Sequence, residues 1–263
     1  MKGTLVIYRR ELAGLFRAPI GWLLLLLALA ANGFLFYAYM SGSRGNVTAS
    51  LEGALGGGPT FWAFIVLLPP LLAMRMLSEE SGNGTLEYLL TAPITDAAVV
   101  VGKHLAATTF MAILWSSVLI YAAAIHMAGA APDWAALLCT YVGAVLVSGL
   151  FLSIGLLASC LSSTPLLAAF LAFLACVTWL MIPQLVNLIM GQVRVWFESS
   201  AGGLVAAENW IRGALDKMDV LRHFQTSFRL GVLDSAELVF FLTWPAFFLF
   251  LTVRALEARR WRG

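Results

Sequence analysis

The sequence predicts an all-α membrane protein, and three observations support this fold class. Hydrophobic residues make up 61% of the 263 residues and charged residues only 11%, with a mean hydropathy of +0.89. So few charged side chains cannot cover a soluble globule of this size. The apolar residues also gather in continuous runs that are long enough to cross a hydrocarbon core, which needs about 20 helical residues. We therefore expect a single polytopic transmembrane domain over residues 1–263.

Six apolar runs meet this length requirement. Each must be a helix, because backbone groups in lipid need partners within their own segment and the runs are too continuous for barrel strands. The predicted spans are residues 20–40, 61–77, 105–127, 134–161, 166–190 and 236–253. Prolines at Pro69–Pro70, Pro183 and Pro245 remove backbone donors and predict kinks in the second, fifth and sixth spans.

The positions of Lys and Arg set the predicted orientation. Ten of the 16 basic residues lie on one side if six spans are correct, and five of the other six lie in one long loop that can cross regardless of charge. Both termini are therefore expected in the cytoplasm. A cleaved secretory signal is the alternative, because Arg9 and Arg10 precede an apolar stretch with Ala-Leu-Ala at residues 28–30. That stretch continues to Tyr39, which favours a retained anchor.

Residues 1–17 have an amphipathic pattern of their own. Apolar side chains recur at helical spacing, which predicts an interfacial helix or, equally, a charged leader that only enforces topology. The apolar positions are Leu5, Tyr8, Leu12 and Phe16, and the opposite side carries Gly3, Arg10 and Arg17. Pro19 is expected to end this helix and to turn the chain into the membrane.

Residues 191–235, before the last span, are too long for a simple turn on the outer side. They show apolar residues roughly at helical spacing, which predicts one amphipathic helix. These residues are Ile211, Leu215, Met218, Leu221 and Phe224. The helix is expected on the outer leaflet, with a gate over a pathway exit as the alternative.

Small and polar residues inside the spans predict packing more than chemistry. Gly149 with Ser153, and Gly155 with Ser159, form small-xxx-small pairs that permit close helix contact. Uncharged polar groups in the spans are expected mostly to bond a neighbouring helix. They are Asn32, Thr178, Gln184 and Asn187, with His126 near the outer end of the third span. No acidic residue lies deep inside a span, which argues against a proton-driven carrier.

The residues needed for catalysis or nucleotide binding do not come together in the sequence. The Glu79-Glu80 pair matches an intramembrane metalloprotease only superficially, since the three histidines are scattered. Cys139, Cys160 and Cys176 all fall in predicted spans and are expected to be unpaired. Gly102-Lys103 lacks the upstream glycine and following hydroxyl of a phosphate-binding loop. An ATP-driven process would therefore need its motor on another polypeptide.

Residues 78–103, between the second and third spans, form the longest polar interruption on the predicted cytoplasmic side. After a Gly-Asn-Gly turn, Thr85 can cap a short helix with an apolar face, which Pro93 then stops. That face carries Leu86, Leu89 and Leu90, while Glu87 projects elsewhere. Thr95 with Asp96 can cap the helix that leads into the third span. Arg75 lies four residues before Glu79 and predicts an ion pair; a substrate-binding Arg75 is the alternative.

This segment resembles the signature of permease subunits of type-2 ABC exporters. The residues that carry the resemblance are Glu79, Glu80, Gly84, Thr85, Leu86, Glu87, Leu89, Leu90, Pro93 and Gly102-Lys103. The C-terminal part is similar to the gliding-motility branch of that class. It shows His223-Phe224, Gly-Val-Leu-Asp at residues 231–234 and Leu-Glu-Ala-Arg-Arg-Trp at residues 256–261.

The resemblance implies a six-helix half-transporter that pairs with a second copy or a related permease. It also implies docking of two cytoplasmic ATPase subunits, which would bind ATP and Mg, on Glu79, Glu80 and a coupling helix at residues 85–90. The chain itself is expected to be non-catalytic and to bind no cofactor, metal or nucleic acid, with lipid around it. We expect an exporter in the bacterial cytoplasmic membrane. The alternative is a non-transporting anchor or mechanotransmission subunit acting on a periplasmic partner.

Overall fold

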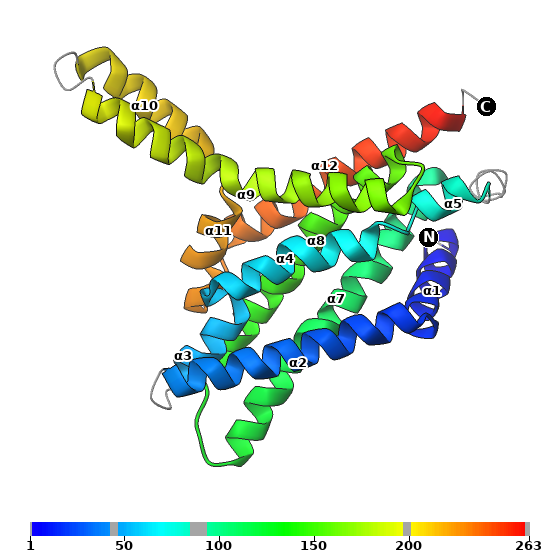
Figure 1. The fold of residues 1–263 in the computed structure, drawn as a ribbon, viewed down its shortest axis with the longest axis horizontal. Helices are drawn as coiled ribbons and strands as arrows, with labels where there is room; N and C mark the ends of the chain where they lie inside the picture. Colours follow the sequence, from blue (N-terminus) through cyan, green and yellow to red (C-terminus); the bar gives the residue numbers. More distant parts are fainter. Residues whose placement is uncertain (1, 43–46, 85–93, 197–200, 261–263) are drawn as a thin grey trace.

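The computed structural model describes residues 2–42, 47–84, 94–196 and 201–260 (Figure 1). The chain is helical and free of strands throughout these ranges, and six helices in them are long and apolar enough to cross a membrane. They are α2 (Pro19–Gly42), α4 (Pro59–Ala73) with its extension α5 (Ser78–Gly82), α7 (Asp96–Met127), α8 (Trp134–Leu161), α9 (Pro165–Trp196) and α12 (Ser235–Arg260). The predicted fold class is confirmed.

Helix α8 lies at the centre of the bundle and packs against α4, α7, α9 and α12 (Figure 1). Most of α8 is buried inside the protein, whereas only a small part of α2, α9 and α12 is buried. Two glycines of α8 allow the neighbouring elements to pack closely around it. A Cβ atom on Gly155 would lie 2.7 Å from Cβ of Ala73, and one on Gly143 would lie 2.6 Å from the Phe228 ring. The predicted close contact at Gly155 and Ser159 is therefore present, and its partner is α4.

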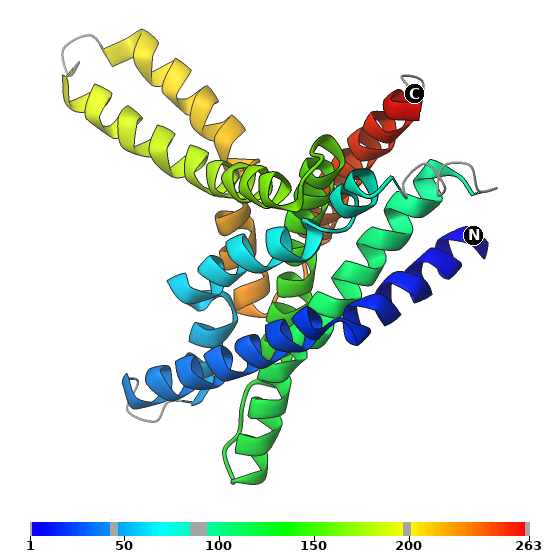
Figure 2. The same ribbon diagram turned by 45° about the vertical axis from the view of Figure 1, so that its right-hand side comes forward.

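The N-terminal helix α1 (Lys2–Arg17) packs along the first part of α7, and both chain ends lie at the same end of the bundle as α5 (Figures 1 and 2). Three of the four predicted apolar positions face the protein: Leu12 and Phe16 pack against the core, and Tyr8 donates to Thr109 of α7. Leu5 is 51% exposed, whereas Ile7 is buried against Gly102, and Gly3 lies against Ile94. Glycines on both helices, Gly3 and Gly102, allow α1 and α7 to lie this close together. A pattern of apolar side chains does not identify such glycine contacts. Pro19 begins α2, as expected.

Several helix limits differ from the predicted spans. Helix α7 begins at Asp96, nine residues before the predicted span at residue 105, and Thr95 caps it by accepting from the Ala98 amide, as predicted. Helix α9 continues to Trp196 and bends along its length (Figure 1). Helix α4 runs through Pro69 and Pro70, and the helix is interrupted at residues 74–77, one turn beyond them.

The end of the bundle opposite the termini is closed by short helices and aromatic rings. Helix α3 (Val47–Glu52) and the π-helical turn η1 (Gly53–Gly57) precede α4. The predicted single helix before the last span was wrong: α10 (Ala201–Asp216) and α11 (Val220–Thr226) are separate, followed by the 3-10 turn η2 (Phe228–Leu230). Asp219 starts the second helix by accepting from the Arg222 amide.

Phe224 on α11 is fully buried, not on a surface face. Its ring centroid lies 5.4 Å from those of both Phe61 and Trp62 and 6.1 Å from that of Phe228. Phe61 in turn lies 5.0 Å from Trp115 of α7. We call these five residues the aromatic cluster. By contrast, α10 and the distal part of α9 run side by side away from the bundle as an arm (Figures 1 and 2).

Candidate functional site: the base of the coupling region

The candidate site is the point where the second span ends and the predicted coupling region begins. We define the α5 base as residues 74–82, which comprise the helix break and α5. Glu79 and Glu80 lie at the end of the second span, as expected, on α5, which follows the break after α4. The charged and hydroxyl groups around this short helix come from four other helices.

Two hydroxyls bond the backbone at the break between α4 and α5: that of Ser159 on α8, and that of Ser78, whose Oγ also donates to the Met74 carbonyl. Ser159 Oγ accepts from the amides of Leu77 (3.1 Å) and Ser78 (3.0 Å) and donates to the Met74 carbonyl (3.1 Å). In a continuous helix the Ser78 amide would bond that carbonyl directly. A side chain inserted into the backbone ladder is an established cause of sharp kinks. Ser159 is therefore inserted at the break and satisfies backbone groups that the break releases.

A charged cluster of Arg10, Glu11, Glu80 and Lys103 joins α1, α5 and α7. Lys103 Nζ lies 3.1 Å from Glu11 Oε1 and 2.8 Å from Glu80 Oε1. Arg10 Nη2 lies 2.6 Å and 3.3 Å from the same two oxygens. Lys103 is only 1% exposed, so its charge depends on these carboxylates, because an unpaired buried ammonium is very costly. Two cations and two anions make the cluster neutral.

Two further contacts complete the surroundings of α5. Arg259 of α12 donates from Nη1 to Ser81 Oγ at 2.8 Å, which connects the last helix to α5. The predicted pair of Arg75 and Glu79 is present, with Nε 3.2 Å from Oε1 and both side chains about half exposed. Helices α1, α7, α8 and α12 thus all bond the α5 base.

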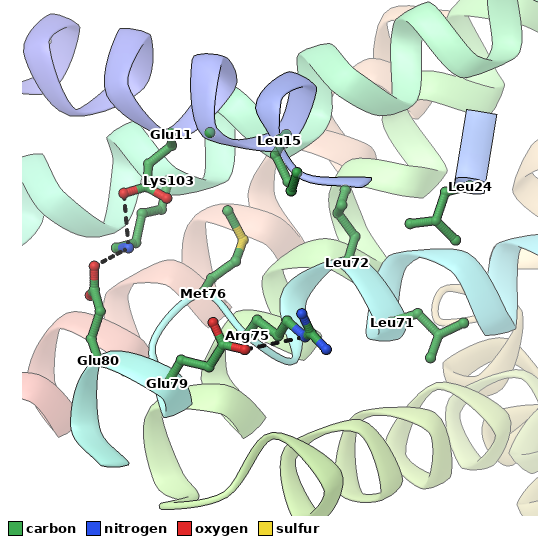
Figure 3. Close-up of a pocket in the computed structure, with 12 residues that line it drawn as sticks. Glu11, Leu15, Leu24, Leu71, Leu72, Arg75, Met76, Glu79, Glu80 and Lys103 are labelled. Carbon is green, nitrogen blue, oxygen red and sulfur yellow. Dashed lines mark hydrogen bonds and ion pairs between the residues drawn. The ribbon is translucent and has the colours of Figure 1, made fainter. Parts of the chain in front are cut away.

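A cavity of about 240 Å³ lies beside the α5 base, between α1, α2 and α4 (Figure 3). One end is polar and the other apolar. The polar lining is Glu11, Arg75, Glu79, Glu80 and Lys103, and the apolar lining includes Leu15, Leu24, Leu71, Leu72 and Met76. Figure 3 shows Arg75 between the two ends.

The predicted coupling helix lies outside the described residues. This applies to Thr85, Leu86, Glu87, Leu89, Leu90 and Pro93. Gly84, the last described residue before it, has a φ of +70°, a left-handed conformation that favours glycine. The sequence did not point to Glu11, Ser159 or Arg259 as neighbours of this region. Their separations along the chain exceed what any local pattern can connect.

Two of the uncharged polar groups in the spans bond another part of the protein. Asn32 Nδ2 donates to Ser117 Oγ on α7 at 3.3 Å, the interhelical bond that was expected of such groups. Gln184 reaches Asp219 at 3.3 Å. The three cysteines are free, as predicted. In the described ranges, no group of three or more His, Cys, Asp or Glu side chains is placed to hold a metal ion.

Comparison with known proteins gives one finding. A family model described as "ABC-2 family transporter protein" matches residues 5–257, nearly the whole chain. No curated protein matches the sequence.

Proposed function

This chain belongs to the ABC-2 transporter family, and from that premise we propose that it is the permease of an ATP-driven exporter, moved by a separate ATPase. Family membership makes it the membrane-spanning permease subunit of an ABC transporter, with six helices fit to cross the bilayer in the described ranges. The family also implies ABC ATPase partners. The direction of transport and the route of coupling are the parts that we propose.

The α5 base carries the coupling proposal. It directly precedes residues 85–90, the segment that we propose the ATPase binds, and it is bonded to α1, α7, α8 and α12. A force applied to this segment would therefore reach four helices at once. Closure of the ATPase subunits, which bind ATP and Mg, would shift the ends of these helices that bond the α5 base.

The wider assembly follows from the same proposal. We place both termini and the α5 base in the cytoplasm, because ten of the 16 basic residues fall on that side. The protein would work in a bacterial cytoplasmic membrane as a dimer, with a second copy or a related permease. ATP would bind only the partner subunits, and residues 85–90 would be their docking element together with Glu79 and Glu80.

Cysteine cross-linking of the assembled complex tests this proposal. Glu87→Cys lies in the proposed docking segment, while Met127→Cys lies at the other end of α7 and is 88% exposed. We expect a short bifunctional cross-linker to join Glu87→Cys, and not Met127→Cys, to the ATPase subunit. Labelling of Glu87→Cys from outside intact cells, or cross-links to lipid alone, would contradict the proposal.

The projecting arm of α9 and α10 favours a second candidate function. An arm that extends away from the bundle at the end opposite the α5 base offers a contact surface for a periplasmic partner (Figure 1). The chain would then transmit force without moving a solute. ATP turnover that is indifferent to every solute and lipid, together with a partner captured on the arm, would support this function over export.

A further inference from the structure

We propose that the cavity beside the α5 base binds the headgroup of a zwitterionic phospholipid, with the phosphate on Arg75 and the ammonium on Glu79. The first observation is the order of the lining residues. In Figure 3 the carboxylates and Lys103 lie at one end, Arg75 lies in the middle, and Leu71, Leu72 and Leu24 lie at the other end. This order is that of an amphiphile: a charged head followed by apolar chains.

Arg75 is the group suited to a phosphate. In the described part of the chain its recorded contact is a single ion pair through Nε to Glu79, and its terminal nitrogens extend toward the leucines (Figure 3). Its side chain is 51% exposed, so these nitrogens can be reached. A guanidinium presents a planar fork that binds phosphate oxygens in pairs. Lys103, by contrast, is buried between Glu11 and Glu80 and is already neutralised.

The carboxylates favour a headgroup that also carries a positive charge. The lining holds Glu11, Glu79 and Glu80 against Arg75 and Lys103, and Arg10, beside the cavity, balances the third carboxylate. A zwitterionic headgroup keeps this site neutral, whereas a purely anionic headgroup would add an unbalanced charge. Glu79 is bonded to Arg75 through one oxygen, and its side chain is 45% exposed, so it can accept an ammonium beside the phosphate.

The apolar end continues toward the membrane. Leu67 lies one turn deeper than Leu71 on the same face of α4 and is 43% exposed, and Leu27 lies one turn beyond Leu24 on α2 and is 50% exposed. The cavity, at about 240 Å³, is smaller than sites that enclose a drug-sized molecule. It therefore fits a headgroup, while the acyl chains would lie on these leucines in the bilayer.

Native mass spectrometry of the purified full chain, without any ATPase, tests the site. The chain is titrated with phosphatidylethanolamine, phosphatidylglycerol or diacylglycerol of equal chain length. We expect retained phosphatidylethanolamine, with about tenfold weaker retention for Arg75→Met and an intermediate value for Arg75→Lys. Arg254→Met is the matched control, because Arg254 also pairs with a nearby Glu on an exposed helix face but lies outside the cavity. This variant should retain the lipid as the unmodified chain does.

Three results would overturn the proposal. If Arg75→Met retained phosphatidylethanolamine as well as the unmodified chain does, Arg75 would not be part of the site. Equal melting temperatures would show that both proteins are folded. If phosphatidylglycerol were retained as well as phosphatidylethanolamine, the ammonium would make no contact that contributes to binding. Displacement of the lipid by soluble phosphoethanolamine at equal concentration would make a free phosphate ester the ligand. Since no ATPase is present, each of these results leaves the coupling proposal untouched.

Discussion

The two ends of the helix bundle are held together by different physics. At the end with the termini, the α5 base is bonded by charges and hydroxyls from four helices. At the other end, the aromatic cluster packs α4, α7, α11 and η2 together without a charge. Close-packed aromatic rings tolerate little rearrangement. At the α5 base, by contrast, the half-exposed Arg75–Glu79 pair and the Arg259–Ser81 hydrogen bond can exchange partners at modest cost. We infer that the aromatic end is fixed and the α5 base is the part that moves.

Phe224→Ala should give the largest loss of stability and so test the fixed end. The ring is fully buried against three other aromatic rings, and truncating such a phenylalanine costs about 3–5 kcal/mol. Chemical unfolding of the detergent-solubilised chain measures this loss. Complexes that remain folded should keep the normal dependence of ATP hydrolysis on the permease. A loss of that dependence would break the division between the two ends.

Lys103→Met should destabilise the chain by about 3 kcal/mol, because it leaves Glu11 and Glu80 with only the half-exposed Arg10 to balance their two charges. The same unfolding measurement applies. The triple variant Lys103→Met, Glu11→Gln, Glu80→Gln is the control and should regain most of the stability. If the single variant were as stable as the unmodified chain, the cluster would not hold α1, α5 and α7 together.

Ser159→Ala should have an intermediate effect of about 1–3 kcal/mol, because it removes the acceptor of two buried amides. The Ser78 amide would then be free to bond the Met74 carbonyl, which would join α4 and α5 into one helix. Spin labels on either side of the break report this straightening as a longer separation. Ser153→Ala is the matched control, since that hydroxyl bonds only its own helix, at the Leu150 carbonyl. An unchanged separation in Ser159→Ala would show that the break has another cause.

Exchange of the charges at Arg75 and Glu79 should have the smallest effect, below about 0.5 kcal/mol, because both side chains are about half exposed. Arg75→Glu alone places two like charges four residues apart and should be mildly destabilising. Adding Glu79→Arg should restore stability. If the second change gave no rescue, the pair would contribute nothing to the α5 base.

The sequence predicted the membrane spans well, because the bilayer dictates their length and helical structure. It predicted poorly the features that depend on contacts between helices. Six spans follow from the need to satisfy backbone groups in lipid, and α8 has the predicted limits, Trp134–Leu161. Ser159 was recognised as a small residue, but its insertion into α4 depends on how two helices lie in space. Lys103 reads as an ordinary basic residue near a span end, because its partner Glu11 lies 92 positions away.

The outer segment shows the same limit. Helical spacing marked Phe224 as apolar but could not distinguish a face on lipid from a place in the core. The break before α11 had a local signal in Asp219, a residue type that favours helix starts. The position of α1 against α7 had no such local signal in the sequence, because it depends on the fit of Ile7 against Gly102. An apolar pattern indicates that one face of a helix must be buried. Only the packing of the folded chain decides whether lipid or another helix buries it.

A double-mutant cycle between Lys103 and Glu80 tests most directly whether force passes through the α5 base. The measured quantity is the ATP hydrolysis rate of the assembled complex relative to that of the ATPase alone. Lys103→Met and Glu80→Gln should each reduce this ratio strongly, and the double variant should be no worse than either, because both changes remove the same contact. Ratios equal to that of the unmodified complex, in variants shown to be folded, would contradict the account.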